Sequence, residues 1–273
     1  MKVYISADME GTGGVVHSNQ TESSHPEYER ARKLMIGEVN AAVEGALKGG
    51  AKTVLVNDSH ASMRNLLVEE MHPEAILLSG SPKPYSMMSG LDAGFDAVFF
   101  TGYHARAGSS FANLDHTWYG PNYVQGVWLN GIEVGEYGLN AAFAGYFGVP
   151  VALVTGDQTV CAQVKELLGA DLETVVVKEA VGRVAARNFH PTRVQAMIRQ
   201  AAERALAKKR KPFVLKPPIT LRLAFARSSQ ADQCLLMPNV KLVSPRAVEL
   251  TLDDYAVLFN AFRALLVLAD IQA

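Results

Sequence analysis

Short apolar segments, separated by longer amphipathic ones, are the feature that most restricts the fold of this chain. The apolar segments cover residues 3–7, 52–57, 97–101 and 151–155. They are apolar almost without interruption, which is typical of strands buried on both faces. Residues 26–48 carry an apolar side chain every three or four positions and end at Gly49-Gly50, as a helix does. This alternation predicts an α/β fold whose mainly parallel sheet is flanked by helices.

The pattern changes after residue 178. Residues 191–209 and 253–269 predict helices, and residues 219–225 and 248–252 alternate apolar with polar side chains. Such alternation suits an antiparallel sheet with one face in solvent. We therefore expect an α/β metal-binding catalytic domain over residues 1–178 and a second, smaller α+β domain over residues 179–273. Within the first domain, Asn130-Gly131 lies between two apolar runs and predicts a tight β-hairpin.

Charge, hydropathy and cysteine content argue against several classes of protein. The chain has 26 Lys and Arg against 27 Asp and Glu, which indicates neither nucleic-acid binding nor a polybasic membrane anchor. No apolar run reaches the roughly 18 residues that a transmembrane helix needs. Cys161 and Cys234 lie far apart, which favours a reducing compartment. The chain begins with a strand pattern rather than a signal peptide, so we expect a cytoplasmic protein.

Polar side chains follow three of the predicted strands at the point where each strand ends. Asp8 and Glu10 follow the first strand, Asp58 and His60 the second, and His104 the third. The carboxyl ends of parallel strands share one edge of a sheet, where ligands bind, so these side chains should converge there. Carboxylates and imidazoles together can form a metal site. The residues alone leave other readings equally open: turn and cap chemistry for the first four, and a satisfied core histidine for His104.

The motifs around these residues resemble those of a known family. The segments are Ser-Ala-Asp8-Met-Glu10-Gly, Val-Asn-Asp58-Ser-His60, Gly-Tyr-His104-Ala-Arg and Gly-Glu136-Tyr-Gly-Leu-Asn140. In order, spacing and context, the chain resembles the bacterial zinc D-aminopeptidases associated with dipeptide-transport operons. Residues 66–73, 80–84 and 236–238 share that resemblance, which therefore runs through nearly the whole chain.

The resemblance implies a centre of two zinc ions held by three acids and two histidines. By motif, these ligands are Asp8, Glu10, His60, His104 and Glu136. Glu136 is preferred over Glu133 because it carries the Gly-Glu-x-Gly context. Five side chains for two ions require a bridging carboxylate, and we expect Asp8 to be that bridge.

The family also has a histidine shortly after the Gly-Tyr-His motif that acts as nucleophile or base, and His116 matches it. The alternative reading is a solvated loop histidine. Arg106 could bind a substrate carboxylate or form a structural salt bridge. The segment Gly11-Thr12-Gly13-Gly14 lacks the Lys-Ser/Thr of a phosphate-binding loop, and we expect it to form a flexible rim of the active site. The four histidines outside the strand-end pattern, His17, His25, His72 and His190, should be surface or capping residues.

The activity implied by the resemblance is hydrolysis of the first peptide bond of short peptides that carry a free N-terminal D-amino acid, such as D-Ala. The family also implies a ring-shaped homo-oligomer, a decamer of two stacked pentamers, to which the smaller domain should contribute. Two alternatives remain from the sequence. One is a different metal-dependent amidase or deacylase on the same scaffold, because substrate choice depends on pocket shape. The other is a non-catalytic dipeptide-binding relative.

Overall fold

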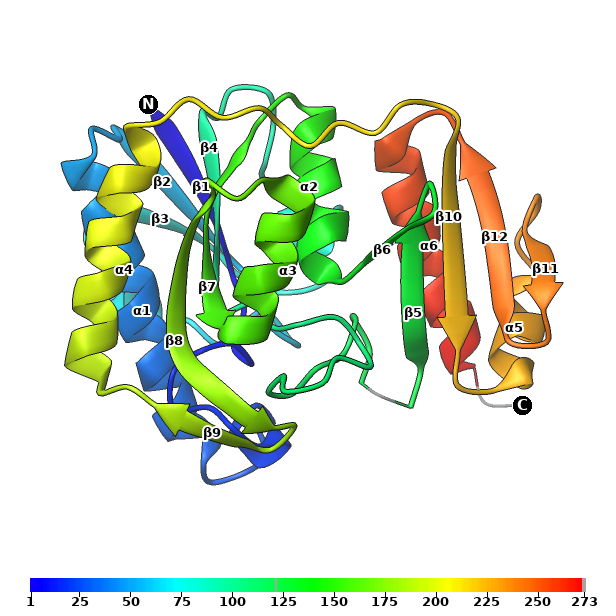
Figure 1. The fold of residues 1–273 in the computed structure, drawn as a ribbon, viewed down its shortest axis with the longest axis horizontal. Coiled ribbons are helices and arrows are strands. Elements are labelled where there is room, and N and C mark those ends of the chain that lie inside the picture. Colours follow the sequence, from blue (N-terminus) through cyan, green and yellow to red (C-terminus); the bar gives the residue numbers. More distant parts are fainter. Residues whose placement is uncertain (121, 272–273) are drawn as a thin grey trace.

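The computed structural model describes residues 1–120 and 122–271, which form two β-sheets with six α-helices packed around them (Figure 1). The large sheet has the strand order β3-β2-β1-β4-β7-β8-β9. The small sheet has the order β11-β12-β10-β5-β6. Three short 3-10 helices lie in the connections: η1 (Ser18–Gln20), η2 (Val68–Glu70) and η3 (Ser86–Met88). Among the described residues, no helix has both the length and the apolar character needed to cross a membrane.

The large sheet is parallel except for its last strand, β9, which pairs antiparallel with β8. All five residues of β4 and all seven of β7 are buried, as the uninterrupted apolar runs predicted. The predicted mainly parallel sheet is therefore confirmed. Its strands are β1 (Lys2–Ala7), β2 (Thr53–Asp58), β3 (Ala75–Leu78), β4 (Ala97–Thr101), β7 (Val151–Asp157), β8 (Glu173–Gly182) and β9 (Ala185–Asn188).

Helices cover both faces of the large sheet. On one face, α1 (Tyr28–Lys48) and α4 (Pro191–Leu206) bury residues such as Val39 and Ile198 against Val3 and Ile5 of β1. On the other face, α2 (Glu136–Tyr146) and α3 (Gln158–Leu168) pack against side chains of β1 and β4 that point the opposite way. Figure 1 shows α2 and α3 between the large sheet and the small one. Asp157 caps α3 through bonds from two backbone amides, as expected of an acid at that position.

The small sheet is antiparallel throughout. Its central strand β10 buries alternate residues, so the predicted one-sided pattern is confirmed. Asn130 and Gly131 both have positive φ angles, 49° and 81°, and form the predicted hairpin turn between β5 and β6. The strands are β5 (Val124–Leu129), β6 (Ile132–Val134), β10 (Ile219–Phe225), β11 (Lys241–Ser244) and β12 (Ala247–Leu252), and the helices packed on them are α5 (Ser228–Cys234) and α6 (Tyr255–Asp270).

The two sheets do not follow the division expected at residue 178. That boundary falls inside β8, while β9 and α4 lie after it and still belong to the large sheet and its helical layer. Conversely, the β5-β6 hairpin lies before the boundary and belongs to the small sheet. Local sequence signals identify the hairpin but cannot show that it pairs with β10, about ninety residues further along the chain. β8 carries polar residues such as Lys178 and Glu179, and in the sequence they look like the end of the apolar pattern of the first domain.

Candidate metal centre

The loops after β1, β2 and β4 meet at one edge of the large sheet. Backbone bonds hold them together: the amide of Asp8 donates to Thr101 O at 2.8 Å, and the amide of Ser59 donates to Ala7 O at 2.8 Å. The amide of Gly11 donates to Gly102 O at 2.7 Å. These contacts bring Asp8, Glu10, His60 and His104 to a single place, as their strand-end positions predicted.

The close approach of the loops after β1 and β4 depends on Gly102. Its φ angle of +68° is unfavourable for other residues, and a Cβ atom added there would lie 2.1 Å from Asp8 O. A side chain at this position would therefore push apart the backbones that carry Asp8 and His104.

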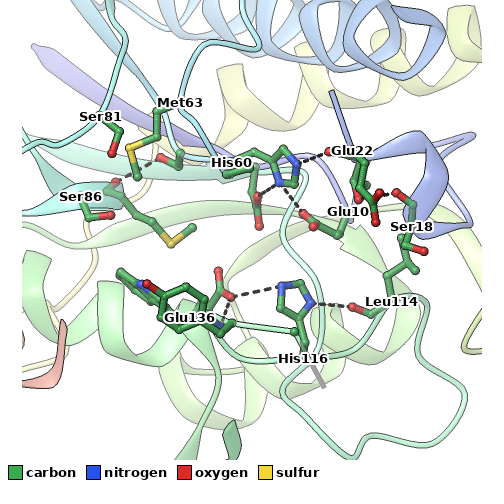
Figure 2. A pocket seen from close by; sticks show the side chains of 18 of the residues that line it. Glu10, Ser18, Glu22, His60, Met63, Ser81, Ser86, Leu114, His116 and Glu136 are labelled. Atoms are coloured by element: carbon green, nitrogen blue, oxygen red, sulfur yellow. Dashed lines mark hydrogen bonds and ion pairs between the residues drawn. The ribbon is translucent and has the colours of Figure 1, made fainter. Parts of the chain in front are cut away.

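Five buried side chains face one another at this edge. Asp8 reaches both histidines, with Oδ1 3.4 Å from His60 Nδ1 and Oδ2 3.4 Å from His104 Nε2. Glu10 Oε2 lies 3.0 Å from His60 Nδ1, and Glu136 Oε1 lies 3.3 Å from His104 Nε2. Figure 2 shows Glu10 and His60 on one side of the pocket and Glu136 and His116 on the other. The structure thus brings together all five residues predicted as metal ligands.

Glu136, rather than Glu133, belongs to this cluster. It is the first residue of α2, and the backbone amide of Trp118 donates to its Oε1 at 2.5 Å. Glu133 instead forms an ion pair with Arg106 at 3.3 Å on the β5-β6 hairpin. Arg106 also donates to the hydroxyl of Tyr137 and does not line the pocket around the cluster. Of the two roles considered for Arg106, the structure favours the structural salt bridge.

Each histidine is oriented by a backbone carbonyl on its far side. His60 Nε2 lies 2.9 Å from Thr21 O, His104 Nδ1 lies 3.1 Å from Ala105 O, and His116 Nδ1 lies 2.8 Å from Leu114 O. A carbonyl only accepts, so each of these nitrogens carries a proton. The opposite nitrogen faces the cluster, where a metal ion would replace its proton, an arrangement typical of metal-binding histidines.

His116 lies directly against this cluster. Its ring stacks on that of His104, with centroids 3.9 Å apart and an interplanar angle of 9°. Its Nε2 lies 3.7 Å from Glu136 Oε1, and its side chain is 14% exposed and borders the pocket. Asp115, its neighbour in sequence, turns away and pairs with Arg183 at 3.2 Å. His116 is therefore not a solvated loop residue.

The donor set fits a metal ion. Asp8 Oδ2, Glu10 Oε2 and His104 Nε2 are buried and make no hydrogen bond to any described residue, although such atoms are normally satisfied. Two overlapping groups could each hold an ion: Asp8, Glu10 and His104 form one, and His104, His116 and Glu136 the other. Carboxylate oxygens and imidazole nitrogens are suitable ligands for zinc.

The electrostatics of the cluster also favour a cation. Burial and the charge of Glu10 raise the pKa of Asp8 to about 7. Burial opposes a charged imidazole, yet the surrounding carboxylates raise the pKa of His104 to about 10 and that of His60 well above its usual range. Three acids in one buried place thus stabilise positive charge strongly, and a divalent ion can supply it.

The pocket around the cluster has a volume of about 780 Å³, within the range of small-ligand sites. Its wall combines the ligand cluster with the apolar side chains of Met63, Met87 and Trp118. Further charged groups also line it, among them Glu22, Arg183 and Arg263. A small polar molecule carrying both charges could therefore be bound next to the metal ligands.

The glycine-containing segment after Glu10 is anchored, which differs from the flexible rim that we expected. The fully buried ammonium group of Lys178 donates to Glu10 O and Val15 O, and the amide of Gly13 donates to Glu38 Oε1 at 2.8 Å. Sequence reasoning missed Lys178, although a lysine directly after Val175-Val176-Val177 is unusual in a buried strand. Thr21 and Trp118 were missed because they act through backbone atoms, which no residue type reveals.

The other four histidines lie outside the cluster: His17 and His190 cap helices, and His25 and His72 accept a bond in a turn. In each, the Nδ1 atom accepts a bond from the backbone amide two residues later.

Comparisons with known proteins find relatives along the whole chain. The family model described as D-aminopeptidase matches residues 1–264. The D-aminopeptidase of Bacillus subtilis (strain 168) is 37% identical over 274 residues, which cover 99% of this chain and 97% of that relative. Among solved structures, the Zn-dependent D-aminopeptidase DppA from Bacillus subtilis, a self-compartmentalizing protease, matches with a TM-score of 0.96 and 36% identity. The match covers 100% of this chain and 99% of that chain.

Proposed function

The chain belongs to the D-aminopeptidase family, and from that premise we propose that it hydrolyses the first peptide bond of short peptides with a free N-terminal D-amino acid, such as D-Ala, at a zinc centre. The observation that carries this proposal is the cluster of three buried carboxylates and two oriented imidazoles. Three of its donor atoms, Asp8 Oδ2, Glu10 Oε2 and His104 Nε2, make no hydrogen bond to a described residue. The zinc dependence of the similar Bacillus subtilis structure supports the choice of metal.

In this proposal the five side chains would hold two zinc ions, with the carboxylate of Asp8 shared between them. Asp8 is suited to that role because its two oxygens face different histidines, His60 and His104. Glu10 lies beside His60 and Glu136 beside His104, so these two carboxylates would complete the two ends of such a centre. Zinc in such a site lowers the pKa of water to about 7 and polarises a carbonyl group.

His116 is the proposed catalytic residue, as nucleophile or as proton shuttle. Its Nε2 borders the pocket, while Leu114 O fixes the opposite nitrogen in the protonated form. Burial and the neighbouring charge of His104 lower the pKa of His116. A neutral imidazole with a free nitrogen at the pocket wall can take a proton during attack on the scissile carbonyl and return it to the leaving amine.

The enzyme assembles, in this proposal, as a ring-shaped homo-oligomer, a decamer. Large apolar side chains in the C-terminal part of the chain are exposed, including Leu236 after α5 at 69% and Val257 on α6 at 56%, and such surface suits contacts between subunits. The similar Bacillus subtilis enzyme is a self-compartmentalizing protease. The free, buried state of both cysteines fits a cytoplasmic location.

Metal removal tests the central part of the proposal. Chelation should abolish hydrolysis of D-alanine p-nitroanilide, and added Zn²⁺ should restore it, with two zinc ions per chain by elemental analysis. Full turnover in a sample shown to be free of metal would contradict a zinc mechanism. Binding of dipeptides without turnover at full zinc occupancy would indicate the non-catalytic relative instead.

Substrate blocking tests the aminopeptidase assignment. N-acetylation of a D-Ala peptide should abolish cleavage, because an aminopeptidase must bind the free ammonium group, and the L-Ala isomer should react far more slowly. Equal rates with free and blocked termini would favour the amidase or deacylase alternative.

A further inference from the structure

One cation at the pocket has no acidic partner among the described residues. The pocket is lined by Arg183 and Arg263. Arg183 already pairs with Asp115, whereas no described carboxylate lies within ion-pair distance of Arg263. The contrast matters because a guanidinium near a buried site is normally balanced by an acid.

The contacts of Arg263 leave half of its guanidinium available. Arg263 lies on α6, and its Nη1 donates to Pro84 O and to Asn260 Oδ1, both neutral acceptors. Within residues 1–120 and 122–271, its Nε and Nη2 atoms make no hydrogen bond in the structure. These two nitrogens form the fork that binds a carboxylate with two parallel hydrogen bonds.

The environment of Arg263 makes that charge costly without a partner. The side chain is half-buried, and burial lowers the pKa of its guanidinium below the usual range. Its neighbours on α6, Phe259 and Phe262, pack against the ring of Trp118, which also borders the pocket. An anion bound there would compensate for the water that this apolar wall excludes.

We propose that Arg263 binds the C-terminal carboxylate of the substrate, so that the enzyme prefers short peptides with a free C-terminus over C-terminal amides. This inference rests on the proposed function. The charges of a short peptide then match those of the pocket: its ammonium group meets the side where Glu22 lies, and its carboxylate meets Arg263.

A pair of substrates with the same scissile bond tests this inference. D-Ala-Gly and D-Ala-Gly-NH₂ differ only in the C-terminal charge. The wild-type enzyme should have a higher kcat/KM for the free acid. Arg263→Met should lower that kcat/KM about 10- to 100-fold, as expected for loss of a charge-assisted pair of hydrogen bonds. The loss should appear mainly in KM, because the carboxylate that Arg263 binds does not take part in the reaction, and hydrolysis of the amide should change little.

Two further variants control for structural effects. Arg246→Met removes an exposed arginine that also donates to a backbone carbonyl, Ala226 O, but lies outside the pocket. In this variant the preference for the free acid over the amide should stay at its wild-type value. Arg263→Lys keeps the charge but loses the fork, and its preference should fall between those of the wild type and Arg263→Met.

The outcomes separate this inference from the function on which it depends. If the wild type cleaves both peptides with equal kcat/KM, or if Arg263→Met lowers both rates equally, the role of Arg263 is overturned and the aminopeptidase assignment stands. If the wild type cleaves neither peptide nor D-alanine p-nitroanilide, both are overturned.

Discussion

At the scale of single residues, the rings of His104 and His116 stack on each other, yet replacing each of them should have a different effect. His104→Ala deletes a proposed metal bond, so zinc occupancy should fall together with activity. His116→Ala should leave zinc occupancy nearly intact, while kcat falls about 100-fold or more if the residue transfers a proton. Elemental analysis and steady-state kinetics on both variants check this.

If His116→Ala loses zinc, His116 is a metal ligand rather than the catalytic base. This outcome has to be tested because His116 belongs to one of the two groups that could hold an ion. Retention of both zinc and full turnover would move the catalytic role to another residue.

Glu38 provides a pH-dependent test, because burial raises its pKa to about 8. An acid whose folded-state pKa is raised stabilises the fold below its unfolded pKa of about 4.5, and that contribution is lost as the pH rises to 8. Glu38→Gln stays neutral and keeps an oxygen for the amide of Gly13. In urea unfolding, the free energy of unfolding of the variant should rise relative to that of the wild type by up to about 1.4 kcal/mol per pH unit between pH 5 and 8.

Glu29→Gln controls for the loss of one negative charge, because Glu29 lies exposed on the same helix, α1. A difference in unfolding free energy between Glu38→Gln and the wild type that stays constant from pH 5 to 8 would contradict the neutral, buried carboxyl group.

At the scale of elements, the centre depends on the close approach of the loops after β1 and β4. Gly102→Ala places a Cβ atom 2.1 Å from Asp8 O, so we expect lower stability together with a clear loss of zinc occupancy. Gly108→Ala is the matched control, because Gly108 also has a positive φ, 78°, but a Cβ there meets no atom within 4 Å. It should cost only about 1 kcal/mol in stability and leave zinc bound. Equal zinc contents in the two variants would show that the loop approach does not set the geometry of the centre.

The elements also show how far the sequence could predict this site. The uninterrupted apolar runs predicted β1, β2, β4 and β7 as parallel strands, and the polar residues at their ends then had to converge. Glu136 required the family motif, because residue pattern alone does not separate it from Glu133. The partners of the centre could not be predicted: Thr21 and Trp118 contribute backbone atoms, and Arg263 reaches the pocket from a helix more than a hundred residues away in sequence.

At the scale of the whole molecule, the two sheets share one core. Buried residues of β4, α2, β10 and α6 belong to a single hydrophobic cluster, in which Phe143 of α2 packs on Phe259 of α6 with ring centroids 5.0 Å apart. Sequence patterns suggested two consecutive domains, because the spacing of apolar residues shows whether a segment is a helix or a strand but not which segment it packs against. A shared core instead predicts that both layers unfold together.

Phe143→Ala tests that cooperativity. The side chain is fully buried, so its loss should cost about 3–5 kcal/mol. Far-UV circular dichroism reports mainly on the helices. Tryptophan fluorescence reports on Trp118, which lies beside α6, and on Trp128, which lies on β5. At fixed zinc and protein concentration, both signals should shift to lower temperature together, because the aromatic contact joins the two layers. Phe111→Ala makes the same change at a side chain that is 71% exposed and should leave the transition in place. Separate transitions for the two signals in Phe143→Ala would mean that each sheet is stabilised by its own core.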